Sequence, residues 1–290
     1  MGSFTGHKSP DFIIQKNNKI YSVEAVVANF SQNSKPEEER NFEDVYGEND
    51  IYQIIDASIF RTLNAITYKS NKFLTTYSTK ECVASNPYII ALADYGQINY
   101  GQAAFYSMMS VLYNAAYDPE GKLDLKILCD DSFGNEYKYI ESCKNHNGEK
   151  LPLGLFSNYE NKHISAILFT CTLTLGKLTS LTKNHTPSRF VYLERQHIKQ
   201  IRYSGSETDE SLLDGLFLFL NPYAEHSVEL ESFQGKGLTV ITGDLENENE
   251  FQIHCKNSST LIRRKVGMRG EERRLLKDID KFIFHPVVKQ

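Results

Sequence analysis

The sequence predicts a single α/β domain over residues 1–290, with a mixed central sheet flanked by helices. Three features of the pattern lead to this fold class. Two runs of strand-forming residues flank an Asn pair, apolar residues recur at helical spacing over 51–66, and a continuous apolar run occupies 88–93. Strands that alternate with a long helix are typical of α/β proteins.

The first expected element is a hairpin close to the N-terminus. Residues 12–14 and 20–23 are β-branched or aromatic at most positions, which favours strands. Asn17 and Asn18 lie between them and tolerate positive φ, so they permit a primed hairpin turn. Pro10 cannot donate to a strand ladder, so it fits the beginning of the first strand.

Pairing about this turn would bring two carboxylates, Asp11 and Glu24, together at the other end of the hairpin. Paired carboxylates suit Mg²⁺ or Mn²⁺, and such an ion generates hydroxide and stabilises a phosphoryl transition state. Glu24 lies in the apolar run 23–28, where a carboxylate is costly to bury without a metal or a hydrogen-bond partner. The alternative is that Asp11 begins a strand after a turn and Glu24 is a solvated strand residue.

Pro10-Asp11, a spacer of twelve residues and Glu24-Ala25-Val26 resemble the signature of the PD-(D/E)XK nucleases, the restriction-endonuclease-like superfamily. The resemblance implies a restriction-endonuclease-like core with added β elements. It also implies that Asp11 and Glu24 hold Mg²⁺ or Mn²⁺ and that the chain cleaves phosphodiester bonds, in DNA rather than RNA.

The lysine of that signature is missing, because Val26 stands where the family usually has it. In the family, this lysine positions or activates the attacking water. Some members move the basic group to another strand or to a following helix. Lys16, Arg61 and Lys69 are candidates for it here by their order in the sequence.

The wider chain is also similar to a group of uncharacterised bacterial proteins built around such a core. The matching pieces fall between about residues 10 and 230, at 23–29, 86–95, 164–170 and 219–224.

A helix and a buried strand are expected after the hairpin. Isoleucine or leucine at every fourth position over 51–63, continued by Ile66, predicts the helix, which would pack on the sheet and could present Arg61 or Lys69 near the site. A surface role for either cation is the simpler interpretation. The run 88–93 predicts a strand covered on both faces, and it ends in Asp94, which is a candidate for a direct role or for capping a turn.

The remaining chain divides by composition. We expect a nuclease-like core of about residues 10–117 that ends in a second helix formed by residues 101–117. A polar insertion of about 118–160 is expected to hold a hairpin of 123–128 against 136–140. A β-rich extension of about 161–290 is expected to contain strands, among them 164–170, 238–242 and 251–255.

Basic residues gather at two places in this extension. Arg195, Lys199 and Arg202 fall within 192–203, which could line a phosphate groove or form a solvated edge strand. Residues 263–277 hold seven cations in fifteen positions, which suit a nucleic-acid or partner contact or a solvated helix face. The segment from Pro36 to Asp50 is in contrast strongly acidic, and 31–49 is expected to be a loop.

Composition narrows the class of protein. The net charge of -5 and the pI near 5.9 argue mildly against affinity for phosphate over the whole surface. Five dispersed cysteines without a CxxC pair suggest reduced thiols in the cytoplasm rather than a zinc site. No apolar run is long enough to span a bilayer, so no membrane partner is expected.

Two hypotheses of function follow from these features. The first is a metal-dependent nuclease that acts on nucleic acid, with a homodimer as one partner hypothesis, since many nucleases of this type dimerise. The second is a nuclease-like scaffold without catalysis, a binding or interaction subunit with a protein partner. Val26, the acidic pI and the short stretch before Pro10 favour the second. A weaker third hypothesis is an unrelated α/β enzyme in which Asp11 and Glu24 are ordinary residues.

Overall fold

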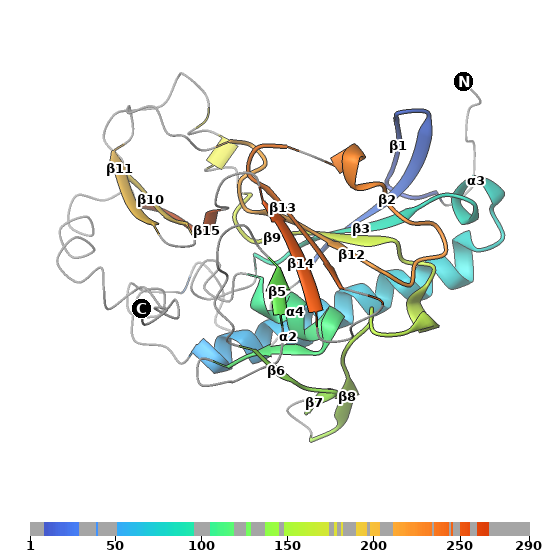
Figure 1. Ribbon diagram of the computed structural model, residues 1–290, viewed down its shortest axis with the longest axis horizontal. Coiled ribbons are helices and arrows are strands. Elements are labelled where there is room, and N and C mark those ends of the chain that lie inside the picture. Colours follow the sequence, from blue (N-terminus) through green and yellow to red (C-terminus); the bar gives the residue numbers. More distant parts are fainter. Residues whose placement is uncertain are drawn as a thin grey trace.

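The computed structural model describes the chain in segments: residues 9–28, 39, 51–95, 105–118, 126–128, 137–144, 148–173, 177–178, 181, 190–195, 198–203, 211–233, 235–243, 245, 250–255 and 260–266. A mixed sheet of eight strands forms the centre of the molecule (Figure 1). In spatial order its strands are β1 (Phe12–Lys16), β2 (Lys19–Val27), β3 (Tyr88–Ala93), β9 (Ala166–Thr170), β12 (Leu216–Leu220), β13 (Leu238–Gly243), β14 (Glu250–Cys255) and β5 (Lys126–Leu128).

The hairpin of β1 and β2 is confirmed. Asn17 and Asn18 have φ of 51° and 61°, and Lys16 pairs with Lys19, so the turn has two residues. Two consecutive residues with positive φ match the right-handed twist of the paired strands. The register continues to Phe12 opposite Val23, which sets the end of the hairpin beside Glu24.

Helix α2 (Ile51–Lys72) connects β2 to the parallel strand β3. It runs along one face of the sheet (Figure 1). The predicted apolar stripe is confirmed, because the core on this face includes four α2 residues, Ile55, Ile59, Leu63 and Ile66. The helix is longer than its stripe and continues into a π-helical turn, η2 (Phe73–Tyr77), followed by the short helix α3 (Glu81–Ala84).

The two faces of the sheet carry separate cores. Strand β3 shows the division, since Ile90 packs with α2 and with α4 (Tyr106–Tyr113), whereas Ile89 packs on the opposite face. Successive side chains of a strand point to opposite faces of the sheet. A strand that is covered on both faces is therefore apolar along its whole length. The prediction of a fully covered strand over 88–93 is confirmed. The second face is covered in part by the segment that holds η4 (Leu230–Phe233).

The second helix is shorter than predicted. Asn114 follows α4 with a φ of 60°, and residues Ala115–Tyr117 form strand β4 rather than a further helical turn. Asn tolerates this left-handed conformation, and its side chain donates to the Ile140 carbonyl oxygen at 2.7 Å. The helix therefore ends at a left-handed Asn114, whose side chain bonds to a carbonyl group 26 positions later in the chain.

The predicted hairpin of 123–128 against 136–140 is wrong. Strand β5 pairs in parallel with β14 at the edge of the large sheet, and β6 (Tyr137–Tyr139) pairs with β4. Neighbouring strands in sequence commonly pair with each other, but here β5 pairs with a strand more than a hundred residues later and β6 pairs with the strand that follows α4. A further small sheet joins β7 (Ser142–Lys144) to β8 (Lys150–Pro152), and η3 (Tyr159–Asn161) precedes β9.

A separate three-stranded sheet contains β10 (Phe190–Arg195), β11 (Ile198–Tyr203) and β15 (Thr260–Val266). The helix interpretation of the C-terminal basic segment is therefore wrong for residues 263–265, which lie in β15. Its other cations, Arg269, Arg273, Arg274 and Lys277, lie outside the described residues, as does the acidic segment 36–50 except for Glu39. None of the helices in the described ranges is long and apolar enough to cross a membrane.

The turn of the first hairpin gives a test of its backbone conformation. We expect Asn18→Val to lower the free energy of unfolding by about 1–2 kcal/mol, because a β-branched residue is strained at positive φ. Asn18→Gly should leave it unchanged or raise it, since glycine adopts this conformation without a steric cost. Urea denaturation measures both. The control is Gln15→Val in the exposed, extended part of β1, which should change stability little; equal losses from both valines would contradict the turn.

Candidate functional site

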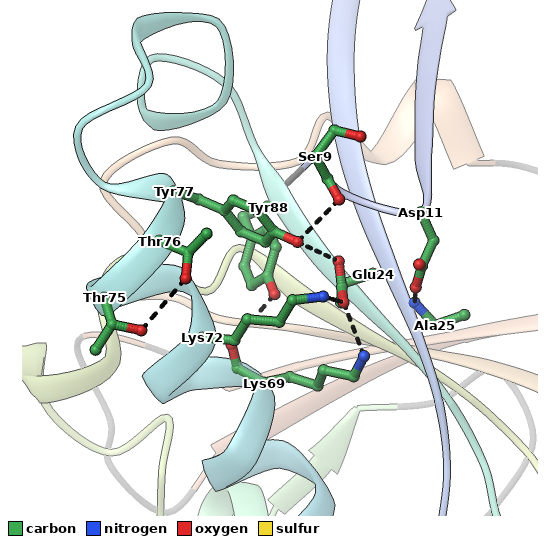
Figure 2. Close-up of polar contacts among 10 residues, drawn as sticks. All are labelled: Ser9, Asp11, Glu24, Ala25, Lys69, Lys72, Thr75, Thr76, Tyr77 and Tyr88. Carbon is green, nitrogen blue, oxygen red and sulfur yellow. Dashed lines mark hydrogen bonds and ion pairs between the residues drawn. The ribbon is translucent and has the colours of Figure 1, made fainter. Parts of the chain in front are cut away.

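Glu24 is the centre of the candidate site. It lies in the middle of β2, and its side chain is 0% exposed beneath the end of α2. Lys69 Nζ donates to its Oε1 at 2.8 Å, and Lys72 Nζ donates to the same oxygen. The Tyr77 hydroxyl donates to Oε2 at 3.1 Å and also lies 2.9 Å from the Ser9 carbonyl oxygen. Figure 2 shows these groups converging on the Glu24 carboxylate from the helix side.

The helical geometry explains why these three residues meet. Lys69 and Lys72 are three positions apart on α2 and therefore share a face. In a regular helix the next residue on that face would be Thr76. The Ser78 amide instead donates to the Phe73 carbonyl oxygen at 2.9 Å, an i to i+5 bond that adds one residue to the turn. This π-helical turn brings Tyr77 to the carboxylate.

The charged groups of the cluster stabilise one another in their ionised forms. Burial by itself would raise the pKa of Glu24, but hydrogen bonds from Lys69 and Lys72 and their charges outweigh it and lower the pKa. Burial likewise opposes the charge of Lys72, but its hydrogen bonds to Glu24 and Tyr77 raise the pKa above the ordinary value. Burial and the nearby Glu24 charge raise the pKa of Tyr77. Glu24 and Lys72 are thus ionised at neutral pH, and Tyr77 keeps its proton.

Asp11, the second predicted metal ligand, lies at the predicted end of the hairpin but in a different environment. It is exposed, and its Oδ2 accepts a hydrogen bond from the Ala25 amide at 2.8 Å. In Figure 2 the Asp11 carboxylate is directed at this amide, while Glu24 extends toward α2. The Asp11 charge nevertheless contributes to raising the pKa of Tyr88, which burial and Glu24 raise more strongly.

Asp94 and Arg61 form a second polar cluster. Asp94 is fully buried just beyond β3, where it accepts from Ser58 Oγ at 2.6 Å and from Arg61 Nη2 at 3.3 Å. Ser58 also lies 2.9 Å from the hydroxyl of Ser107 on α4. Since Arg61 and Lys69 are eight residues apart on one helix, their backbones are separated by about 12 Å along its axis. Helix α2 therefore supplies cations to two carboxylates, Glu24 on β2 and Asp94 at the end of β3.

The sequence candidates thus divide into three groups. The structure brings Lys69 to Glu24 and Arg61 to Asp94. Lys16 lies at the turn end of the hairpin, away from Glu24, with its Nζ 5.8 Å from the centroid of the Phe233 ring. Lys72 could have been predicted as a further basic group of the site, because it follows Lys69 by three positions and lies on the same face if the helix continues.

The position of Tyr77 in the site could not have been predicted from the sequence. Helical periodicity would assign this face to Thr76, and only the π-helical turn replaces it with Tyr77.

The donor atoms can be compared with what a divalent cation needs. Within the described residues, no group of three or more His, Cys, Asp or Glu side chains is placed to hold a metal ion. Carboxylate oxygens are the donors that Mg²⁺ prefers, and Asp11 keeps Oδ1 free of hydrogen bonds in the described chain. Glu24 has donors on both oxygens, but the Lys72 side chain is 28% exposed, against 11% for Lys69. Asp11 and Glu24 are the carboxylates that would hold such an ion, and Lys72 would first have to turn away from Glu24 Oε1 into solvent.

Searches of protein-family models, of curated proteins and of solved structures find no match for this chain.

The buried ion cluster should contribute to stability. We expect Glu24→Gln to lower the free energy of unfolding by about 3 kcal/mol, at the lower end of the range for one partner removed from a buried pair, because Lys72 reaches solvent. Urea denaturation measures the change. The matched control is Glu229→Gln. Glu229 and its partner Lys19 are 43% and 45% exposed, so this substitution should lower the free energy of unfolding by less than about 1 kcal/mol. Equal losses would show that the cluster does not fix α2 on the sheet.

The same variant gives a pH dependence with a defined sign. Because the pKa of Glu24 is lowered from 4.5, the unfolded chain binds more protons between the two values, and stability rises with pH there. The difference in unfolding free energy between the wild type and Glu24→Gln should be full above about pH 4.5 and shrink as the pH falls below it. Urea denaturation at a series of pH values measures this difference. A difference that stays constant into acid would contradict the ionised cluster.

Proposed function

We propose that this chain is a metal-dependent nuclease of the PD-(D/E)XK type that cleaves phosphodiester bonds, in DNA rather than RNA, and in which Lys69 replaces the missing motif lysine. One observation carries the proposal. Lys69 Nζ lies 2.8 Å from Glu24 Oε1, although the two residues are 45 positions apart in the chain. A basic group on the helix that follows the motif strands is the displacement that the resemblance allows.

Val26 supports this replacement by its position. It lies two residues after Glu24 on β2, and therefore on the same face of the strand. Val26 is partly buried and packs against the core beneath α2. An apolar residue at this position lets the helix approach closely, and the helix in turn brings its own ammonium group to Glu24.

Asp11 and Glu24 would hold Mg²⁺ or Mn²⁺, which when bound supplies a hydroxide and stabilises charge on the reacting phosphate. The chain's own groups do the rest. Lys69 would orient the attacking water or a phosphate oxygen, since it is held at the carboxylate by a buried ion pair. The Tyr77 hydroxyl would fix Glu24 Oε2. Lys72 would have to leave, because a second ammonium group on the same oxygen opposes a cation there.

A catalytically inactive scaffold is the second candidate, and one observation favours it. Glu24 is already balanced by two ammonium groups and a hydroxyl, and Asp11 already accepts from Ala25. In this form the cluster is complete without an ion and serves to fix α2 on β2. A chain of this kind would act as a binding or interaction subunit, in a homodimer or with a protein partner.

The two lysines separate these candidates. For the nuclease, we expect Lys69→Met to reduce Mg²⁺-dependent cleavage of plasmid DNA by at least about 10²-fold, because it removes the group that orients the nucleophile. Lys72→Met should lower the Mg²⁺ concentration that half-maximal cleavage needs, because it removes the competing cation. Lys16→Met, at the far end of the hairpin, is the control and should cleave like the wild type.

The scaffold predicts a different result in the same experiment. Neither the wild type nor Lys72→Met would cleave, and neither would show a Mg²⁺-dependent rise in melting temperature. A Lys69→Met variant that cleaves at the wild-type rate would rule out the assigned role of Lys69.

A further inference from the structure

Strand β1 leaves one edge of the large sheet open to pairing. It is the first strand in the spatial order of the sheet, and among the described strands it pairs with β2 alone (Figure 1). All five of its residues are exposed, although three are apolar: Phe12, Ile13 and Ile14 are 58%, 51% and 43% exposed. Proteins usually protect an edge strand with a charge, a proline or a bulge, because an exposed apolar edge is a template for another strand. The register of β1 has no bulge, and its first four residues include neither a proline nor a charge.

The pairing with β2 shows which backbone groups of β1 face the open edge. Ile13 lies opposite Ser22, whose amide donates to the Pro87 carbonyl oxygen beside β3 at 2.9 Å. The backbone of Ser22 therefore faces away from β1, and Ile13 and Ser22 form a pair without mutual hydrogen bonds. Because the two kinds of pair alternate along an antiparallel ladder, the N–H and C=O groups of Ile13 and Gln15 point outward. Within the described chain, no hydrogen bond occupies these groups.

We propose that the open edge of β1 pairs antiparallel with β1 of a second copy of this chain, about a two-fold axis that passes beside Ile13. In this register Ile13 lies opposite the partner's Ile13, and Phe12 lies opposite the partner's Ile14. Asp11 lies opposite the partner's Gln15. The outward backbone groups of one strand then meet those of the other, and apolar side chains meet apolar side chains. The interface uses the same patch on both copies, as a two-fold dimer requires.

The charges at the ends of β1 favour a second copy in this direction. Asp11 lies just before the strand, and Lys16 is its last residue. An antiparallel copy brings the carboxylate of each chain to the lysine end of the other, so the two strands complement each other in charge. A parallel copy in the same register would place Asp11 beside the partner's Asp11 and Lys16 beside the partner's Lys16. Like charges directly opposite each other destabilise a strand pair.

This pairing would place two candidate sites on one face of a continuous sheet. A two-fold axis perpendicular to the sheet leaves each side chain on its own face, so Glu24 of both copies lies on the side of α2. Glu24 is one position beyond the pair of Phe12 and Val23, which places it two residues from the axis along the strands. With about 4.8 Å between strands and about 3.4 Å per residue, the two Glu24 positions lie about 20 Å apart. The dimer itself needs neither a metal ion nor cleavage, so it goes beyond the proposed nuclease function and does not depend on it.

Sedimentation velocity of the full chain in EDTA, without nucleic acid, tests the dimer. A strand of five residues is about 17 Å long and buries less than the ~800 Å² per partner of a standard interface, so we expect dissociation at micromolar concentrations, between about 1 and 200 µM. Ile13→Lys and Ile13→Glu each set like charges opposite each other at the axis and should each raise Kd at least about tenfold. An equal mixture of the two variants sets Lys opposite Glu and should associate at least about tenfold more tightly than either variant alone.

Two further variants test the strand pairing and its location. Gln15→Pro removes an amide that faces the open edge, without removing a hydrogen bond to β2, and should raise Kd about tenfold because the two-fold axis doubles the loss. The control is Leu212→Glu, since Leu212 is also 51% exposed and precedes β12, four strands away from β1. This variant should dimerise like the wild type. Thermal unfolding confirms that each variant is folded.

Three results would overturn the assignment. They are a wild type that stays monomeric up to 200 µM, on the order of the highest concentration of the expected range, a mixture of the Ile13 variants that associates no more tightly than either alone, and equal losses from Leu212→Glu and Ile13→Glu. A dimer that behaves as expected, in a chain that does not cleave with Mg²⁺, would support the β1 interface and contradict the nuclease. A monomer that cleaves DNA with Mg²⁺ would contradict the interface alone.

Discussion

A carboxylate buried beneath a helix needs a counter-charge, and this requirement ties the first half of the chain together. Glu24 lies on β2 with 0% exposure, and the end of α2 supplies two ammonium groups and, through η2, a hydroxyl. The ion pairs therefore set how far along β2 the helix must extend. The apolar stripe from Ile55 to Ile66 holds the rest of α2 against the sheet, but the hydrophobic effect is non-directional and constrains the axial position of the helix less than the ion pairs do.

The same cluster links stability to the proposed chemistry. An ion bound at Glu24 would compete with Lys72, which is 28% exposed, whereas Lys69 is only 11% exposed and would keep its place. Asp94 with Arg61 and Ser58 repeats the arrangement one strand away, but the Arg61 side chain is only 11% exposed, whereas Lys72 beside Glu24 is 28% exposed and reaches solvent. We therefore assign Asp94 to the core and Glu24 to the site.

Several parts of this arrangement could be predicted, because they depend on neighbours in the sequence. The Asn17-Asn18 turn, the α2 stripe and the strand at 88–93 each follow from local conformational preference or periodicity. The errors came where distant partners decided the outcome. Asn114 ends α4 by bonding to Ile140, β5 pairs with β14 rather than with the nearby β6, and 263–265 extend along β10. Tyr77 enters the site only because a π-helical turn shifts the register of the helix.

The sequence by itself determined the α/β class, the first hairpin, the long helix and the proximity of Asp11 to the strand of Glu24, since short-range geometry sets all four. It also proposed Lys69 as a basic group for the site. Only the tertiary structure decided that Lys69 and Lys72 share one oxygen of Glu24, that Arg61 belongs to Asp94, and that two basic segments join in one sheet. The reason is physical: ion pairs and strand pairing depend on distances in space, which positions in the chain do not specify.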